Sequence, residues 1–230
     1  MAWGRVRANS PGKLASFLDS PDDVYGSGAD LDATIATNAT MSSDMYYYNL
    51  TVNTGITLNT GGYRLFVKNV LTMGASSVVG LPGGSAATGT LKGGGAASAN
   101  TTNSLGGNGA STTATAITAA AGGSVYYKYA EQAIRGWNVT ASATTPTYLE
   151  GGAGGTGVGG GVVIIAARYI STGGTCTISA TGGAAGGGGA IIFVSSNDEA
   201  TFNAQTHLSL DVSKGTGGGT DGTAIYLEVD

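Results

Sequence analysis

The sequence predicts an all-β protein with a glycine-rich, β-solenoid-like body and an extended N-terminal arm, with a β-sandwich as the alternative fold. One observation is a series of short segments in which Thr, Val, Ile, Leu and Tyr alternate with polar residues between Asn/Gly turns. The other is that 42 of the 230 residues are glycine, many of them in runs directly before the most apolar segments. Together they favour closely packed strands over helices.

The glycine runs are interpreted as packing elements. Residues 151–161 precede the apolar run 162–167, and residues 182–189 precede the apolar run 190–194. A flexible Gly/Ser linker is polar on both sides, which these runs are not. We therefore expect glycine here because a side chain would clash with a neighbouring coil or subunit, and because some positions need a positive φ.

Residues 1–32 differ from the rest of the chain. They contain Arg5, Arg7 and Lys13, two prolines and several aspartates, but little apolar periodicity. Such a segment cannot fold alone, so we expect an arm that becomes ordered on a partner. The residues expected to anchor it are Trp3, Arg5, Arg7, Leu14, Phe17 and Leu18.

Residues 33–230 form the predicted body. Strands are expected over 46–52, 56–58 and 63–73, with the glycines of two turns, Gly55 and Gly61–Gly62, supplying positive φ. Further strands are expected over residues 162–170, 175–180, 190–195, 208–212 and 224–229. Their spacing of about twenty to thirty residues is the period expected of stacked coils.

A low-complexity insertion is expected over about residues 74–124, which are rich in Gly, Ala, Ser, Thr and Asn. We expect its order to depend on partners. Residues 126–137 form the best helical candidate, because they contain good helix formers and a glycine near the C-terminal end.

Composition excludes several classes of function. Only 10% of residues are charged, against roughly 25% in ordinary soluble proteins, so Ser, Thr and Asn must cover the surface. The net charge is −4 and no Lys/Arg stripe is present, so no nucleic-acid partner is expected. No window approaches the roughly 18 apolar residues of a membrane span, and no apolar signal core follows Arg7, so neither membrane insertion nor Sec export is expected.

No catalytic, cofactor or metal site is predicted. The single cysteine, Cys176, and the single histidine, His207, lie in different β-type segments, and no ligand set has metal-binding spacing. Gly155, Gly157 and Gly160 fit the spacing of a dinucleotide loop, but they precede a strand instead of opening a helix.

Paired carboxylates can cleave polysaccharides, and Asp198 with Glu199 is one candidate pair. It is interpreted as a pair of solvated turn residues. Asp30 and Asp32 lack the remaining oxygen ligands of a calcium loop. The chain is therefore not expected to be an enzyme.

Clustered tyrosines are the candidates for contacts between subunits, because tyrosine packs its ring and keeps its hydroxyl wet. The alternative is that these rings stack on sugars. The residues concerned are Tyr46, Tyr47, Tyr48, Tyr126 and Tyr127.

The segment DMYYYNLTVNTGITLNTGGYRLFV at residues 44–67 resembles a unit of glycine-rich phage virion proteins. GGGVVIIAAR at residues 159–168 and GAIIFV at residues 189–194 are similar to later coils of the same proteins. The resemblance covers about residues 28–80 and 150–200. Such proteins are β-helical or glycine-rich, often trimeric, and stand on the virion exterior.

For this chain, the resemblance implies a homotrimer on the virion surface that is assembled in the host cytoplasm. Its partners would be the major capsid protein or tail proteins. The arm favours docking, and so a capsid decoration, cement or head-fibre protein. The alternative is a tail-fibre or tail-tip adhesin that binds a host glycan.

Overall fold

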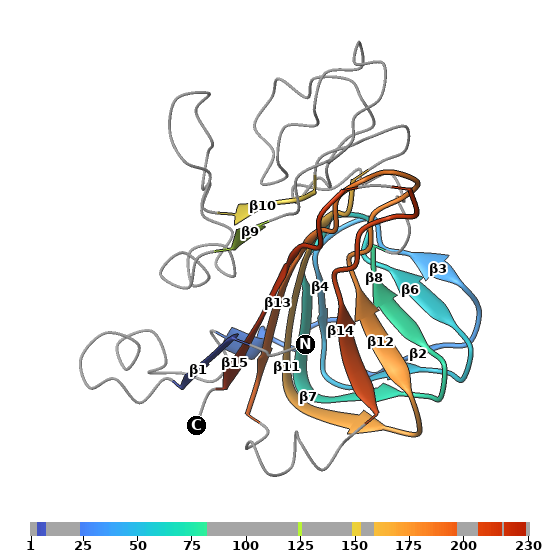
Figure 1. The fold of residues 1–230 in the computed structure, drawn as a ribbon. Coiled ribbons are helices and arrows are strands. Elements are labelled where there is room, and N and C mark those ends of the chain that lie inside the picture. Colours follow the sequence, from blue (N-terminus) through green and yellow to red (C-terminus); the bar gives the residue numbers. More distant parts are fainter. Residues whose placement is uncertain are drawn as a thin grey trace.

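The computed structural model describes residues 24–81, 151–152, 159–196, 207–217 and 219–228, together with the strand segments 4–7, 124–125 and 149–150. It confirms the all-β prediction, with parallel strands in two sheets (Figure 1).

Sheet A has the strand order β1-β15-β13-β11-β7-β5-β2, with β4 also paired to β7. Its strands are β1 (Gly4–Arg7), β2 (Ala33–Ile35), β4 (Met45–Tyr47), β5 (Leu50–Val52), β7 (Leu65–Met73), β11 (Val162–Thr172), β13 (Ala190–Ser195) and β15 (Thr223–Glu228).

Sheet B has the order β14-β12-β8-β6-β3. Its strands are β3 (Ala39–Thr40), β6 (Thr57–Asn59), β8 (Val78–Gly80), β12 (Cys176–Ser179) and β14 (Leu208–Asp211). A separate antiparallel pair joins β9 (Ser124–Val125) to β10 (Leu149–Glu150).

The chain builds the two sheets in repeated passes, each running from sheet A to sheet B. The passes are β2 to β3, β4–β5 to β6, β7 to β8, β11 to β12, and β13 to β14, and β15 then begins a further pass. Each pass pairs in parallel with the passes before and after it. Ala33 lies opposite Leu50, and Val162 opposite Ala190, so these passes are 17 and 28 residues apart.

The third and fourth passes pair directly although a long segment separates them in the sequence. Leu65 of β7 lies opposite Ile165 of β11, and Val78 of β8 lies opposite Thr177 of β12. β8 and the buried Leu81 fall within the segment expected to be low-complexity insertion. Residues 82–123 and the helical candidate 126–137 lie outside the described residues. Between these two ranges, the structure describes the strand β9.

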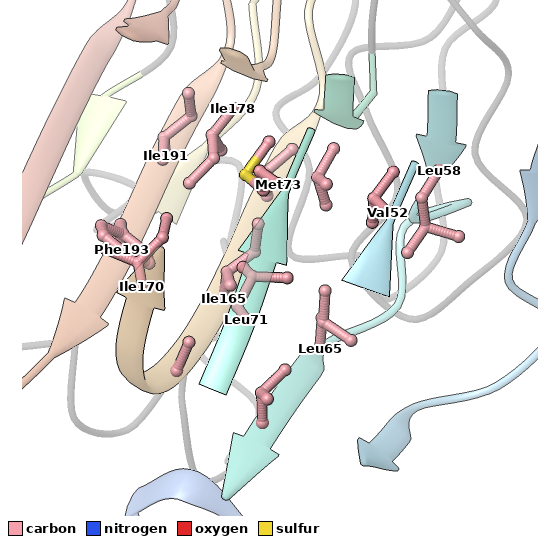
Figure 2. Close-up of a cluster of buried hydrophobic side chains, with 14 of the residues drawn as sticks. Val52, Leu58, Leu65, Leu71, Met73, Ile165, Ile170, Ile178, Ile191 and Phe193 are labelled. Atoms are coloured by element: carbon pink, nitrogen blue, oxygen red, sulfur yellow. The ribbon is translucent and has the colours of Figure 1, made fainter. Parts of the chain in front are cut away.

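The core lies between the two sheets and is built from alternate residues of successive passes (Figure 2). Leu71 and Met73 of β7 and Ile165 and Ile170 of β11 point into it from sheet A, and Ile178 of β12 faces them from sheet B. Because the strand repeat is two residues, the residues between them face outward. Cys176 belongs to this core, as predicted for a small buried hydrophobe.

The outer face of sheet A is buried as well over β11, β13 and β15. Ile164, Ile192 and Ile225 face away from the core and are at most 2% exposed. β9 lies beside β13 and β15 and helps to cover this face. Burial on both faces explains why these strands read as continuous apolar runs in the sequence.

The glycines before β11 and after β12 and β14 pack backbone on backbone. Gly160 donates to the carbonyl of Gly187 at 2.8 Å, and Gly188 donates to that of Thr220 at 3.0 Å. A Cβ at Gly188 would overlap the carbonyl oxygen of Val212, and one at Gly160 would overlap that of Ala180. The layers therefore approach more closely than any side chain permits, as predicted. The positive φ also expected in the runs 151–161 and 182–189 is found at none of their described glycines.

The first strand occupies an unexpected place. β1 is parallel to β15, with Gly4 opposite Ile225 and Arg7 opposite Glu228, so it forms one edge strand of sheet A. Of the other residues expected to anchor the arm, Trp3, Leu14, Phe17 and Leu18 lie outside the described residues.

Replacing Gly188 with alanine should lower the free energy of unfolding by about 3 kcal/mol or more, because neighbouring backbone must move to admit the Cβ. The matched control is Gly173→Ala, where the nearest atom to an added Cβ is 3.8 Å away. The control should stay within about 0.5 kcal/mol of the wild type. Equal urea midpoints for the two variants would show that the glycine layers are not close-packed.

Candidate interaction surface

Three large apolar side chains of the described residues stand exposed, and they gather at one corner of sheet A. Leu31 is 70% exposed, Tyr48 45% and Tyr169 42%. The exposed Arg168 adjoins Tyr169, with its guanidinium carbon 5.4 Å from the ring centroid. We call Leu31, Tyr48, Arg168 and Tyr169 the corner ridge.

The ridge exists because sheet A bends. In β11, Ala167 and Ile170 both face the core, so the two residues between them, Arg168 and Tyr169, must turn outward. The register of β11 against β7 shifts at this point, as in a β-bulge. Figure 1 shows β7 and β11 curving at the corner.

The same bend recurs in the second pass, on the other side of β7. Tyr47 and Leu50 face the core, and Tyr48 lies between them on the outside. Tyr47 and Ala167 both lie opposite Val67, so Tyr48 enters the corner at the level of Arg168. Backbone pairing continues to the first pass, because the Tyr48 amide donates to the Leu31 carbonyl at 2.8 Å.

A ladder of side-chain hydrogen bonds fixes the corner. Asn49 donates through its side-chain amide to Asp32 at 3.0 Å, and Asn69 donates to the side-chain oxygen of Asn49 at 2.9 Å. The Asn49 oxygen also accepts from the backbone amide of Val70 at 3.3 Å. Equivalent residues of three successive passes are thereby joined, which holds the ridge backbone in one conformation.

A second ladder lies beside the ridge. The rings of Tyr46 and Phe66 stack with centroids 4.9 Å apart, and the Arg64 guanidinium lies 5.6 Å from the Phe66 centroid. Asp44 also holds Arg64. The Asp44 carboxylate accepts hydrogen bonds from the backbone amide and from the Nε of Arg64, at 2.8 Å each. The Asp30 carboxylate accepts from the Tyr46 amide at 2.6 Å.

Residues 24–28 cross the outer face of sheet A as a strap. The Tyr25 side chain is only 1% exposed, and its hydroxyl lies 2.7 Å from the Ser196 hydroxyl. At Gly26 the strap lies so close to Phe66 and Tyr46 that a Cβ would come within 2.8 Å of both side chains. The last residues of the expected arm thus pack on the body.

The tyrosines predicted for subunit contacts have different surroundings. Tyr48 is exposed on the ridge, Tyr46 is half-buried in the ring ladder, and Tyr47 packs in the core. Burial raises the pKa of Tyr47, and the Asp30 carboxylate raises it further. Tyr126 and Tyr127 lie outside the described residues.

Sequence reasoning missed Leu31, Arg168 and Tyr169. The available signal was the interruption of the apolar run 162–167 by Arg168 and Tyr169 before Ile170 resumes it. Two polar or amphipathic residues between inward-facing apolar residues mark a corner in a strand. No comparable sequence pattern indicates that Leu31 is exposed, because its exposure depends on its position in the first pass of the stack.

The described residues hold no group of three His, Cys, Asp or Glu side chains placed to share a metal ion. His207 is exposed at the start of β14, and burial raises the pKa of Cys176 to about 11. Asp198 and Glu199 lie outside the described residues. The described part contains no helix long and apolar enough to span a membrane.

What the ridge offers chemically is the Tyr169 ring beside the Arg168 guanidinium, with the exposed Tyr48 ring on the other side of the β7 pass. Tyr and Arg are enriched where protein surfaces meet, because both combine a flat apolar body with hydrogen-bonding groups. Tyrosine rings can also stack on flat ligands such as sugars. The ridge therefore has the chemical character of surfaces at which proteins meet partners.

Tyr25 makes stability pH-dependent in a defined direction. Burial raises its pKa from 10 to about 12, so the unfolded chain ionises first, and stability present below pH 10 is lost as the pH rises towards 12. Tyr25→Phe should cost about 1 kcal/mol at pH 7, through the lost hydrogen bond to Ser196. Near pH 12 the variant should be the more stable protein, because wild type loses on the order of 2 kcal/mol that Phe cannot lose.

Denaturant unfolding of both proteins between pH 7 and pH 12 measures this difference. A difference that stays constant across that range would mean that the Tyr25 hydroxyl is not buried.

Searches of known proteins found no family, no curated protein and no solved structure that matches this chain.

Proposed function

We propose that this chain is a structural protein of a bacteriophage virion exterior, a homotrimeric capsid decoration, cement or head-fibre protein that stabilises the particle. The observation that carries the proposal is the stack of parallel passes with glycine layers packed backbone on backbone. It is supported by the resemblance of residues 44–67 to phage virion proteins.

We also propose that the two sheets are walls of a β-solenoid-like body. Successive passes pair in register in both sheets, and a single core lies between the sheets. A β-sandwich would be built mainly from antiparallel strands, whereas every pairing in sheets A and B is parallel. Such a stack suits a rigid part of an external assembly.

The corner ridge supplies a contact surface in this proposal. Tyr48 and Tyr169 are held by the bend of sheet A, so little conformational entropy is lost when a partner covers them. The arm supplies a second contact, through its basic residues Arg5 and Arg7. The partner in both cases is the major capsid protein or a neighbouring copy.

A tail-fibre or tail-tip adhesin is the second candidate, because exposed tyrosine rings, one of them beside Arg168, are also suited to sugar rings. In that case the same ridge would contact a glycan on the host surface. The two functions differ in what the particle loses without the chain.

The test compares otherwise identical particles with and without the chain. A decoration protein adds its binding free energy to the shell, so particles that lack it should adsorb normally and rupture at lower temperature or milder osmotic shock. Purified chain added back should restore stability. Normal rupture with lost adsorption would reject the capsid role in favour of the adhesin.

Substitutions on the ridge locate the contact. Tyr48→Ala combined with Tyr169→Ala should weaken binding to particles that lack the chain by tenfold or more, while thermal unfolding of the free protein changes little. The control is Thr177→Ala, an outward-facing residue in the middle of sheet B. Equal binding by the ridge variant and the control would show that the ridge is not the contact.

A further inference from the structure

Among the described strands, the first pass of the stack has no further neighbour in either sheet. β2 is the edge strand of sheet A and β3 the edge strand of sheet B. The Ala33 amide donates to Asn49, and the Ile35 carbonyl accepts from Asn53, so both residues face the second pass. The backbone groups of successive residues in a strand point alternately to its two sides. The amide and carbonyl of Thr34 therefore point sideways from the edge of the sheet, away from any described strand.

Nothing in the sequence of this edge protects it from pairing. Charged side chains and proline are the usual protection of an exposed edge strand. Residues 33–43 contain neither. Nearby carboxylates are turned towards later passes: Asp32 accepts from Asn49, and Asp44 binds Arg64. The exposed Leu31 lies at the same end, at a φ of 58° that non-glycine residues adopt infrequently.

The core is also incompletely covered at this end. Ala33, Ile35 and Ala39 pack against the core but remain only partly buried. A further pass in the position before β2 would bury them. Uncovered apolar residues beside unpaired backbone groups are what a strand-pairing partner would cover.

The two ends of the stack differ in shape. At the first pass, β2 and β3 belong to the same pass, so both sheets end at the same level. At the other end, β15 and β1 extend sheet A beyond β13, while sheet B stops at β14, the partner of β13 in its pass. A partner that pairs with β2 and β3 at once must therefore also present two strands that end at the same level. The first pass of a second copy does so, and the other end of the stack does not.

We propose that two copies of the chain join end to end through their first passes. A two-fold axis through the turn at residues 36–38 places β2 of one copy against β3 of the other, and β3 against β2. The paired strands run antiparallel, because one runs towards the turn and the other away from it. The contact is isologous and closes, so it does not propagate into a filament.

Thr34→Pro tests the contact. Proline removes an amide that points away from every described strand, and edge strands tolerate proline at such a position, so the body should remain folded. The missing donor and the ring should prevent pairing with a second copy. Wild type should contain an even number of copies by analytical ultracentrifugation, and Thr34→Pro should have half the wild-type mass. The control Thr34→Val keeps the amide and should keep the wild-type mass.

A cross-link provides a second test that does not depend on the proline variant folding. Thr37 lies in the turn through which the axis passes, so Thr37→Cys should form a covalent dimer under mild oxidation. Thr216→Cys, exposed at the other end of the stack, is the control and should remain uncross-linked. The native Cys176 is buried and should not contribute.

Odd-numbered or monomeric wild type, an unchanged mass for Thr34→Pro, or no cross-link at Thr37→Cys would each overturn the proposal. The inference does not rest on the proposed virion role. If a trimer closes through other surfaces, wild type should be a hexamer and Thr34→Pro a trimer. If only the end-to-end contact exists, they should be a dimer and a monomer, which would reject the homotrimer alone.

Discussion

In-register parallel pairing between successive passes is the interaction on which the other features depend. Because Tyr47, Val67 and Ala167 lie opposite one another, each local irregularity is repeated at the same level in the next pass. A bend that is repeated in successive passes forms a corner, repeated asparagines form a hydrogen-bonded ladder, and exposed side chains at the same level form the corner ridge. The pairing of β7 with β11 continues this order across the long intervening segment, so the body is one stack.

Glycine makes that pairing possible where the chain turns between sheet B and sheet A. The carbonyls of Val212 and Ala180 occupy the places that Cβ atoms of Gly188 and Gly160 would need. Polar backbone in these turns is satisfied by the adjacent turn, as in the bond from Gly215 to Gly186 at 2.9 Å. Low charge is compatible with this arrangement because backbone hydrogen bonds hold the glycine layers together.

Much of the fold was predictable from local pattern, since all-β character, turn glycines and buried strands follow from residues close in sequence. The turn prediction was confirmed at Gly55 and Gly61, where φ is 71° and 61°. The pairing of β7 with β11 and of β1 with β15 was not predictable, because neither register is encoded locally. The exposure of Tyr48 beside the buried Tyr47 depends on a bulge, and a one-residue shift of register reverses which side chains face the core.

Parallel pairing between passes also determines which backbone groups are left unpaired at the ends of the stack. Interior passes satisfy their backbone groups on both sides, so an end pass is the place where the repeat leaves donors and acceptors unused. At one end β1 pairs with β15 and is itself the edge strand of sheet A. At the other end β2 and β3 have no further neighbour among the described strands, and Thr34 directs its amide and carbonyl outward. Residues 33–43 at this second end are uncharged, and both sheets stop there at the same level, so this is the end suited to assembly.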